Sequence, residues 1–195
     1  MSLSSTICGT SYREYDVAMR VRMLLLAFLL TAVAATISAE VVQVAANGCL
    51  LRQEVAIKAS PAAVWAALTG KVGSWWNPAH TYSGDSANLS IDARPGGCFC
   101  ERLPNGGGVE HMRIVNVLPV KMLRMAGALG PFQSSGVAGS MTWELLPAEG
   151  GTTLRLTYSV GGFMPGGFEK IAPAADGVLG DQVQRLKRFV EMGKP

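Results

Sequence analysis

The stretch FEKIAPAADGVLGDQVQRLKRFV, residues Phe168 to Val190, decides the fold. Its apolar residues recur at steps of three and four, which places them on one stripe of a helix; they are Phe168, Ile171, Ala175, Val178, Leu179, Val183, Leu186 and Phe189. The opposite face carries Asp181, Gln184, Arg185, Lys187 and Arg188. Pro173 is expected in the first turn or at a kink, because proline lacks the N–H that a helix interior needs. Gly193 is expected to end the helix, whose long stripe needs a broad apolar surface to cover it.

The residues before this helix predict a series of short strands that could supply that surface. Apolar and polar side chains alternate between turn residues in segments 51–58, 89–93, 98–103, 109–118, 122–129, 137–146 and 152–160. After the first strand, Ser60 and Pro61 are typical of a helix start, and Gly70 is expected to end that short helix. The succession of hairpins favours one antiparallel sheet that wraps the terminal helix. A gap between sheet and helix would be a cavity.

The first 39 residues predict an export signal outside the folded domain. A short basic segment, Met19 to Met23, precedes the apolar run Leu24 to Val33, and small residues lead to a cleavage site after Ala39. The apolar run is short for a membrane span, although an uncleaved N-terminal anchor is the alternative. We therefore expect a periplasmic or secreted protein with a leader (1–39), a linker (40–49) and one domain (50–195), without a stable membrane span after cleavage.

Composition excludes several classes of function. The chain has 195 residues, 49% of them hydrophobic, and a formal charge of +3, so it can build a core but has no basic cluster typical of nucleic-acid binding. Its two histidines, His80 and His111, lack carboxylates at ligand spacing, which argues against a metal site. No phosphate-binding glycine loop occurs either, and we expect no cofactor.

Three cysteines follow the leader, Cys49, Cys98 and Cys100, and an oxidising compartment would allow one disulfide. Cys98 and Cys100 point to the same side of a strand, which predicts strain in a bond between them. A bond from Cys49 to one of the pair is the other pairing considered.

Several segments together resemble the SRPBCC (START-like, helix-grip) superfamily. They are Ser60 to Thr69 (SPAAVWAALT), the pair Trp75-Trp76, Pro95 to Phe99 (PGGCF) and the final helix, and the resemblance covers roughly residues 50–192. The branch similar to this chain contains heat-shock chaperone ATPase activator-like domains, often grouped with polyketide cyclases. The resemblance implies an α+β helix-grip fold, with a seven-stranded curved antiparallel sheet around a long C-terminal helix and a hydrophobic pocket. It implies no single activity, because the fold serves lipid carriers, hormone receptors and cyclases.

The hairpin of residues 98–118 holds the sharpest functional signal. If it is centred on Gly106, Glu101 faces His111 and Phe99 faces Arg113, all four on one face of the sheet. On the concave face, the two charged groups and the imidazole would project into an apolar pocket, where charges are costly unless paired or used. The alternative is a structural network on the outer face, with Met112 and Ile114 inward.

The other candidate ligand contacts are mostly aromatic residues expected at the cavity wall or its mouth: Trp75, Trp76, His80, Trp143, Tyr158 and Phe168. Core packing is the alternative for the aromatic residues. Loop-ordering contacts are the alternative for His80.

Three functional hypotheses follow. The first is an exported protein that binds a small hydrophobic or lipid-like molecule between the sheet and the C-terminal helix. The alternative is a cyclase or aromatase-type enzyme, in which His111 or Glu101 acts as general base and Arg113 stabilises an enolate-like oxygen. The third is a protein-interaction module, which predicts an exposed apolar patch and no pocket.

Overall fold

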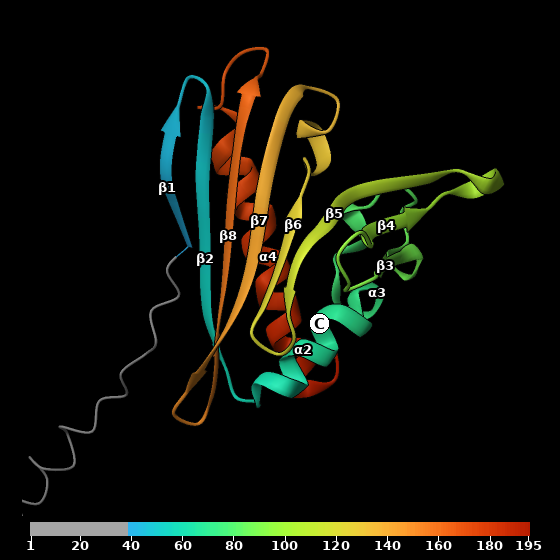
Figure 1. Cartoon of the computed structure of the whole chain (residues 1–195), viewed down its shortest axis with the longest axis vertical. Coiled ribbons are helices and arrows are strands. Elements are labelled where there is room, and N and C mark those ends of the chain that lie inside the picture. The colour runs from blue at the N-terminus through green and yellow to red at the C-terminus, as the bar shows by residue number, and fades with distance from the viewer. Residues whose placement is uncertain (1–38) are drawn as a thin grey trace, which may run out of the picture. The chain divides into compact units, whose positions relative to one another are not determined.

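The computed structural model describes residues 39–195, which contain a single eight-stranded sheet (Figure 1). Its strand order is β1-β2-β8-β7-β6-β5-β4-β3, and every neighbouring pair is antiparallel. The strands are β1 (Ala39–Ala45), β2 (Gly48–Ile57), β3 (Leu89–Ile91), β4 (Cys98–Arg102), β5 (Gly108–Leu118), β6 (Met122–Ala126), β7 (Gly136–Ala148) and β8 (Gly151–Phe163). Together with the long C-terminal helix, this sheet confirms the predicted helix-grip fold.

One strand is additional to the seven expected. β1 lies in the segment where the sequence predicts a linker, and it pairs along β2 from Ala39 opposite Gln53 to Ala45 opposite Gly48. Val41 and Val44 are partly buried against the core. These two valines explain why the segment adds a strand to the sheet edge.

Three α-helices are present in the described part of the chain: α2 (Pro61–Gly70), α3 (Val72–Trp75) and α4 (Ile171–Met192). The Ser60 hydroxyl accepts a hydrogen bond from the N–H of Ala63, which caps α2 as its sequence predicts. Gly193 adopts a left-handed conformation with a φ of 76° and ends α4, because glycine enters this region without a steric cost. No helix within residues 39–195 combines the length and the apolar character needed to cross a membrane.

α4 buries its apolar stripe against the inner face of the sheet (Figure 1). Leu179, Val183 and Leu186 are almost fully buried, and Phe168 just before the helix is completely buried. Pro173 lies in the first turn, so the helix needs no kink to accommodate it. The periodicity therefore predicted the buried stripe correctly, although the helix begins at Ile171 rather than Phe168.

Polar side chains attach α4 to its neighbours on two sides. On one side Gln53 of β2 donates to a carboxylate oxygen of Asp176 over 2.6 Å. On the other side the N–H of Asn77 donates to Gln182 over 2.8 Å, and the Asn77 amide donates to Asp181 over 2.8 Å. The helix face predicted to be polar is therefore partly used for docking, and Gln182 is completely buried.

The strand pair β4–β5 is irregular at His111. Phe99 pairs with Met112 while the next residue, Cys100, pairs with Glu110, so His111 is an extra residue on β5. Such a β-bulge interrupts the alternation of side chains between the two faces. His111 and Met112, although consecutive, are both buried.

Truncation of the α4 stripe should destabilise the protein strongly. Leu186→Ala is expected to lower the free energy of unfolding by about 2–5 kcal/mol, because it leaves a cavity between helix and sheet. Met192→Ala, on the same helix but 58% exposed, is the matched control and should change the free energy by less than about 0.5 kcal/mol. Urea unfolding followed by circular dichroism measures both, and equal losses would contradict the packing described here.

Candidate functional site

A cavity of about 360 Å³ lies beside the first half of α4. Its wall is mostly apolar and combines one helix, three strands and two loop segments. The helix contributes Ile171, Ala174, Ala175, Val178 and Leu179; the strands contribute Phe99, His111 and Tyr158; the loops contribute Trp76, His80, Thr81, Tyr82 and residues 129–132.

His111 and Glu101 form a buried pair at this wall. Nε2 of His111 lies 2.9 Å from Oε2 of Glu101, and the two side chains are 6% and 0% exposed. The Glu101 carboxylate also accepts hydrogen bonds from the backbone N–H groups of Tyr82 and Ser83. A carboxylate surrounded by three donors can remain ionised in the interior without a neighbouring cation.

The pair determines which atom of His111 carries the proton. Burial raises the pKa of Glu101, but hydrogen bonds from Ser83, Tyr82 and His111 together lower it below its ordinary value. Burial lowers the pKa of His111, and the hydrogen bond and charge of Glu101 offset this only in part. His111 is therefore neutral at neutral pH. Because an ionised carboxylate only accepts hydrogen bonds, the imidazole proton is on Nε2.

The second ring nitrogen of His111, Nδ1, is then a hydrogen-bond acceptor. It has no protein partner. Within residues 39–195, Nε1 of Trp143 is the one side-chain nitrogen or oxygen that is both fully buried and without a partner, so Nδ1 of His111 is not fully buried. Nδ1 must therefore touch open space, and His111 borders the cavity. His111 thus presents an unpaired acceptor at a wall that is mostly apolar.

Aromatic rings surround this acceptor. The Phe99 ring lies 4.9 Å from the His111 ring and 5.2 Å from that of Trp76. The hydroxyl of Tyr158 accepts a hydrogen bond from the N–H of Leu129 over 3.1 Å. Burial raises the pKa of Tyr158 to about 12, so its hydroxyl is neutral. The wall around His111 is therefore apolar and uncharged.

Two loops meet where the cavity reaches the surface. Tyr82, which borders the cavity and is 55% exposed, donates its hydroxyl to the carbonyl of Gly130 over 3.3 Å. Its ring lies 5.8 Å from that of His111. Tyr82 therefore stands between the unpaired acceptor and the solvent.

Five of the residues that the sequence suggests as ligand contacts line the cavity: Trp76, His80, Phe99, His111 and Tyr158. Glu101 does not line it but holds His111 from behind, so its contact with His111 agrees with the predicted hairpin. The register itself differs, because Glu101 pairs with Val109 and not directly with His111.

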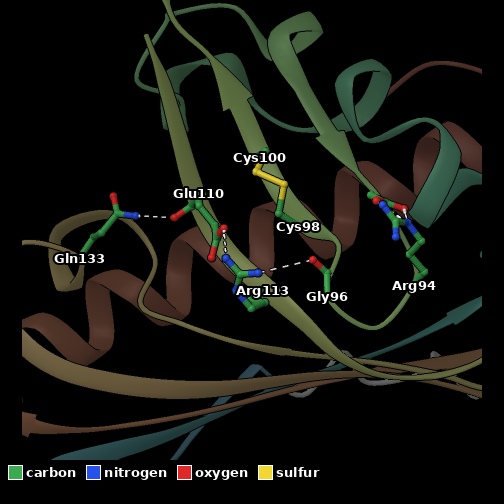
Figure 2. Close-up of a disulfide and its surroundings, with 8 residues drawn as sticks. Arg94, Gly96, Cys98, Cys100, Glu110, Arg113 and Gln133 are labelled. Atoms are coloured by element: carbon green, nitrogen blue, oxygen red, sulfur yellow. Dashed lines mark hydrogen bonds and ion pairs between the residues drawn. A yellow bond between two sulfur atoms is a disulfide. The ribbon is translucent and has the colours of Figure 1, made fainter.

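Arg113 does not reach the cavity, contrary to the sequence-based interpretation. The bulge at His111 shifts the alternation by one residue, so Ile114 points inward and Arg113 outward. On the outer face the Arg113 guanidinium donates to the carboxylate of Glu110 over 2.7 Å (Figure 2). The inward alternative is therefore right for Glu101 and His111, and the outward alternative is right for Arg113.

Three further candidates are core residues outside the cavity wall. Trp75 is fully buried and donates its indole N–H to the carbonyl of Ala67. Trp143 packs edge-on against Trp75 at a ring distance of 6.3 Å. Phe168 is fully buried and stacks on Phe132, which lines the cavity, whereas Phe168 is not among the lining residues. Aromatic periodicity alone does not distinguish a core position from a cavity position.

Sequence reasoning missed the loop at residues 129–132 as part of the wall. The sequence predicts a strand as far as Leu129, but β6 ends at Ala126. Residues 130–132 form a short 3-10 turn, in which no periodic pattern shows which way a side chain points. The hydroxyl of Tyr158 holds the start of this loop, because it accepts from the N–H of Leu129 and lies 3.5 Å from the Gly127 carbonyl. The Gly130-Pro131 pair indicated a turn but not its position over the cavity.

The disulfide joins Cys98 to Cys100, the pairing for which the sequence predicts strain (Figure 2). Cys49 is free and buried. It lies on β2, which four strands separate from β4 in the sheet, so it cannot reach either partner. Within residues 39–195 no three His, Cys, Asp or Glu side chains cluster in a way that could hold a metal ion.

Comparisons with known proteins agree with this architecture. Residues 49–191 match the family described as polyketide cyclase / dehydrase and lipid transport. No functionally curated protein matches the chain.

Solved structures with a similar fold come from several bacteria. A protein from Mesorhizobium loti is 20% identical over 75% of this chain and 99% of its own, with a TM-score of 0.54. The Aha1 dimer from Colwellia psychrerythraea is 20% identical over 75% of this chain and 98% of its own, also with a TM-score of 0.54. CalU16 from Micromonospora echinospora is 16% identical over 76% of this chain and 77% of its own, with a TM-score of 0.53. At these identities the likeness concerns the fold.

Glu101→Gln should lower the pKa of His111 further. The negative charge of Glu101 favours the imidazolium, so its removal leaves burial as the dominant influence. An NMR titration of the imidazole signals measures the shift. Glu110→Gln, which removes a carboxylate from the outer face, is the control and should leave the His111 pKa unchanged. A rise of the pKa toward 6.5 in Glu101→Gln would contradict this account.

Proposed function

The chain belongs to the polyketide cyclase / dehydrase and lipid transport family, and on that premise we propose that it is an exported protein that binds a small apolar molecule between the sheet and α4. Membership confirms the resemblance to the SRPBCC superfamily and is compatible with hydrophobic ligand binding. The observation that carries the proposal is the mostly apolar cavity with the oriented acceptor of His111 at its wall.

The size and lining of the cavity support a small ligand. A volume of about 360 Å³ lies near the lower end of the range of about 300–1,000 Å³ typical of small-molecule pockets. Its apolar side chains would gain contact with a ligand by displacing water from hydrophobic surface. The cavity would therefore hold one or two fused rings, or a short acyl chain, more readily than a complete two-chain lipid.

The polar feature of the wall supports a ligand with a hydroxyl group. Nδ1 of the neutral His111 accepts a hydrogen bond but cannot donate one while Nε2–H is held by Glu101. A hydroxyl or phenol would satisfy this nitrogen, whereas a carbonyl or an ether would leave it without a partner. An unsatisfied buried acceptor is costly, so the pair selects for ligands with one donor.

Catalysis of the cyclase type is less well supported. His111 could accept a proton, but Arg113 lies on the outer face, and no Lys or Arg is among the described residues that line the cavity. The arginine that this hypothesis assigns to an enolate-like oxygen is therefore absent from the wall. A plain interaction module is less well supported too, because that hypothesis predicts no pocket.

Export is supported by the sequence of the leader, in which the basic segment, the apolar run and the small residues before Glu40 occur in the order of a secretory signal. The apolar cavity is compatible with a carrier that collects or delivers its ligand outside the cytoplasm.

A pair of probes tests the choice of ligand. 1-Naphthol should bind about 2- to 10-fold more tightly than 1-methoxynaphthalene, because only naphthol can donate a hydrogen bond to His111. Isothermal titration calorimetry at neutral pH gives both dissociation constants. His111→Phe keeps a ring of similar shape but lacks the acceptor, and it should bind the two probes equally.

Blocking the cavity gives the matched control for binding itself. Ala175→Trp places a large side chain in the cavity and should abolish binding of both probes. Gly177→Trp, two residues away in open space on the same helix, should leave binding intact. Failure of both probes to bind the unaltered protein, or equal binding by Ala175→Trp, would remove the proposal.

Export predicts a processed product. When the full chain is expressed in a bacterium with a periplasm, the periplasmic protein should begin at Glu40, as measured by intact mass. Ala39→Arg should retain the leader, because the cleavage site requires a small residue. A full-length product confined to the cytoplasm would contradict the export proposal and leave the ligand experiment unaffected.

A further inference from the structure

Cys98 and Cys100 lie on the outer face of β4, opposite the residues of that strand that serve the cavity. Both cysteines are partly exposed, whereas Phe99 between them and Glu101 after them are buried. Phe99 borders the cavity, and Glu101 holds His111. The disulfide therefore braces, from the solvent side, the few residues of β4 that shape the proposed site.

The disulfide spans a contracted part of β4. The Cα atoms of Cys98 and Cys100 are 5.4 Å apart, whereas a regular strand advances roughly 6.4–6.8 Å over two residues. Directly opposite, β5 contains His111 as its extra residue. One strand is thus shortened where its partner is lengthened. The bulge that turns His111 inward therefore lies directly opposite the contraction at the disulfide.

The position of this disulfide in the chain argues against a role in overall stability. A disulfide constrains the unfolded chain more strongly when it closes a longer loop. Here the bonded residues are separated by two positions in the sequence, which makes the closed loop very small. Its effect is therefore expected to be local.

The surroundings of the disulfide suit thiol–disulfide exchange. Cys98 is paired across the strands with Arg113, whose guanidinium binds Glu110 and lies 3.5 Å from the carbonyl of Gly96 (Figure 2). Cys100 is paired with Glu110, so the cation and the anion beside the disulfide are bound to each other. Exchange requires that an attacking thiolate reaches a sulfur, and the partial exposure of both cysteines allows this access. Cys49 differs, because it is buried in the core and burial raises its pKa.

We propose that Cys98 and Cys100 form a reversible thiol–disulfide exchange site for low-molecular-weight thiols, and that the state of this site sets the position of His111. In the first step the thiolate of the small molecule attacks one cysteine sulfur, the disulfide breaks, and the other cysteine leaves as a thiolate that takes up a proton. In the second step another small thiolate attacks the mixed disulfide and releases the second cysteine. The protein gains two electrons and two protons, and two small thiols become one disulfide.

Reduction removes the covalent brace on β4. The strand can then lengthen toward regular spacing, and the bulge opposite it loses its matching contraction. We expect His111 to move relative to Glu101 and the cavity to lose its oriented acceptor. The effect on a ligand rests on the proposed binding function, whereas the exchange and the movement of His111 do not.

The first experiment measures the exchange in the folded protein. Purified protein is equilibrated with mixtures of reduced and oxidised glutathione, unreacted thiols are blocked by alkylation, and intact mass counts them. Cys98 and Cys100 should become alkylated together at one ratio of the two forms, and reoxidation should restore the starting mass. Cys49 should stay unmodified. Resistance to excess reduced glutathione, or reduction that occurs only with loss of the circular dichroism spectrum, would overturn the exchange site.

The second experiment measures the coupling. The His111 imidazole NMR signals and the 1-naphthol dissociation constant are compared between the oxidised protein, the reduced protein and the Cys98→Ser/Cys100→Ser double variant. The reduced protein and the double variant should share shifted His111 signals and bind naphthol about 2- to 10-fold more weakly, which is the loss of one hydrogen bond. Arg102→Ala, at an exposed position of the same strand, is the control and should match the oxidised protein.

The outcomes separate this proposal from the proposed function. Identical His111 signals in the oxidised and reduced proteins would overturn the coupling, even if naphthol binds tightly. Shifted signals without naphthol binding in either state would support the coupling and overturn the proposed binding function instead.

Discussion

The attachment of α4 to one part of the sheet and to the segment after α3 is the constraint on which the cavity depends. Gln53 bonds Asp176 from β2, while Asn77 bonds Asp181 and Gln182 from the other side. Leu186 and Val183 fill the space beneath the second half of the helix. The first half places the small residues Ala174 and Ala175 at the cavity wall. The cavity therefore lies beside the half of the docked helix that presents small residues.

The buried Glu101–His111 pair gives this cavity its chemical character. An ionised carboxylate in the interior requires donors, and the backbone of Tyr82 and Ser83 supplies two of them. The third donor is His111, which is thereby held in one tautomer with its acceptor nitrogen free. One loop thus stabilises the charge and also places Tyr82 at the boundary with solvent. The site is built around a neutral acceptor, and no Lys or Arg is among the described residues at its wall.

The two faces of the β4–β5 pair carry different chemistry because of one extra residue. With regular alternation, Arg113 would share a face with His111, and the cavity would contain a cation. The bulge separates them, leaving Arg113 beside Glu110 and the disulfide on the outer face and His111 on the inner face. A change of one position in the register therefore decides whether the cavity wall contains an arginine. The disulfide between Cys98 and Cys100 lies on the outer face of the neighbouring strand.

The sequence by itself determined the periodic features of this protein: the buried stripe of α4, the alternation of the strands, the cap at Ser60 and the end of the helix at Gly193. These features follow from local geometry, since side chains three and four apart share a helix face and alternate ones share a strand face. Only the tertiary structure decided the outward position of Arg113, the burial of Trp75 and Trp143, and the part played by residues 129–132. Those outcomes depend on a bulge, on the distance at which α4 docks and on a loop without periodicity, and each is set by contacts between residues far apart in the chain.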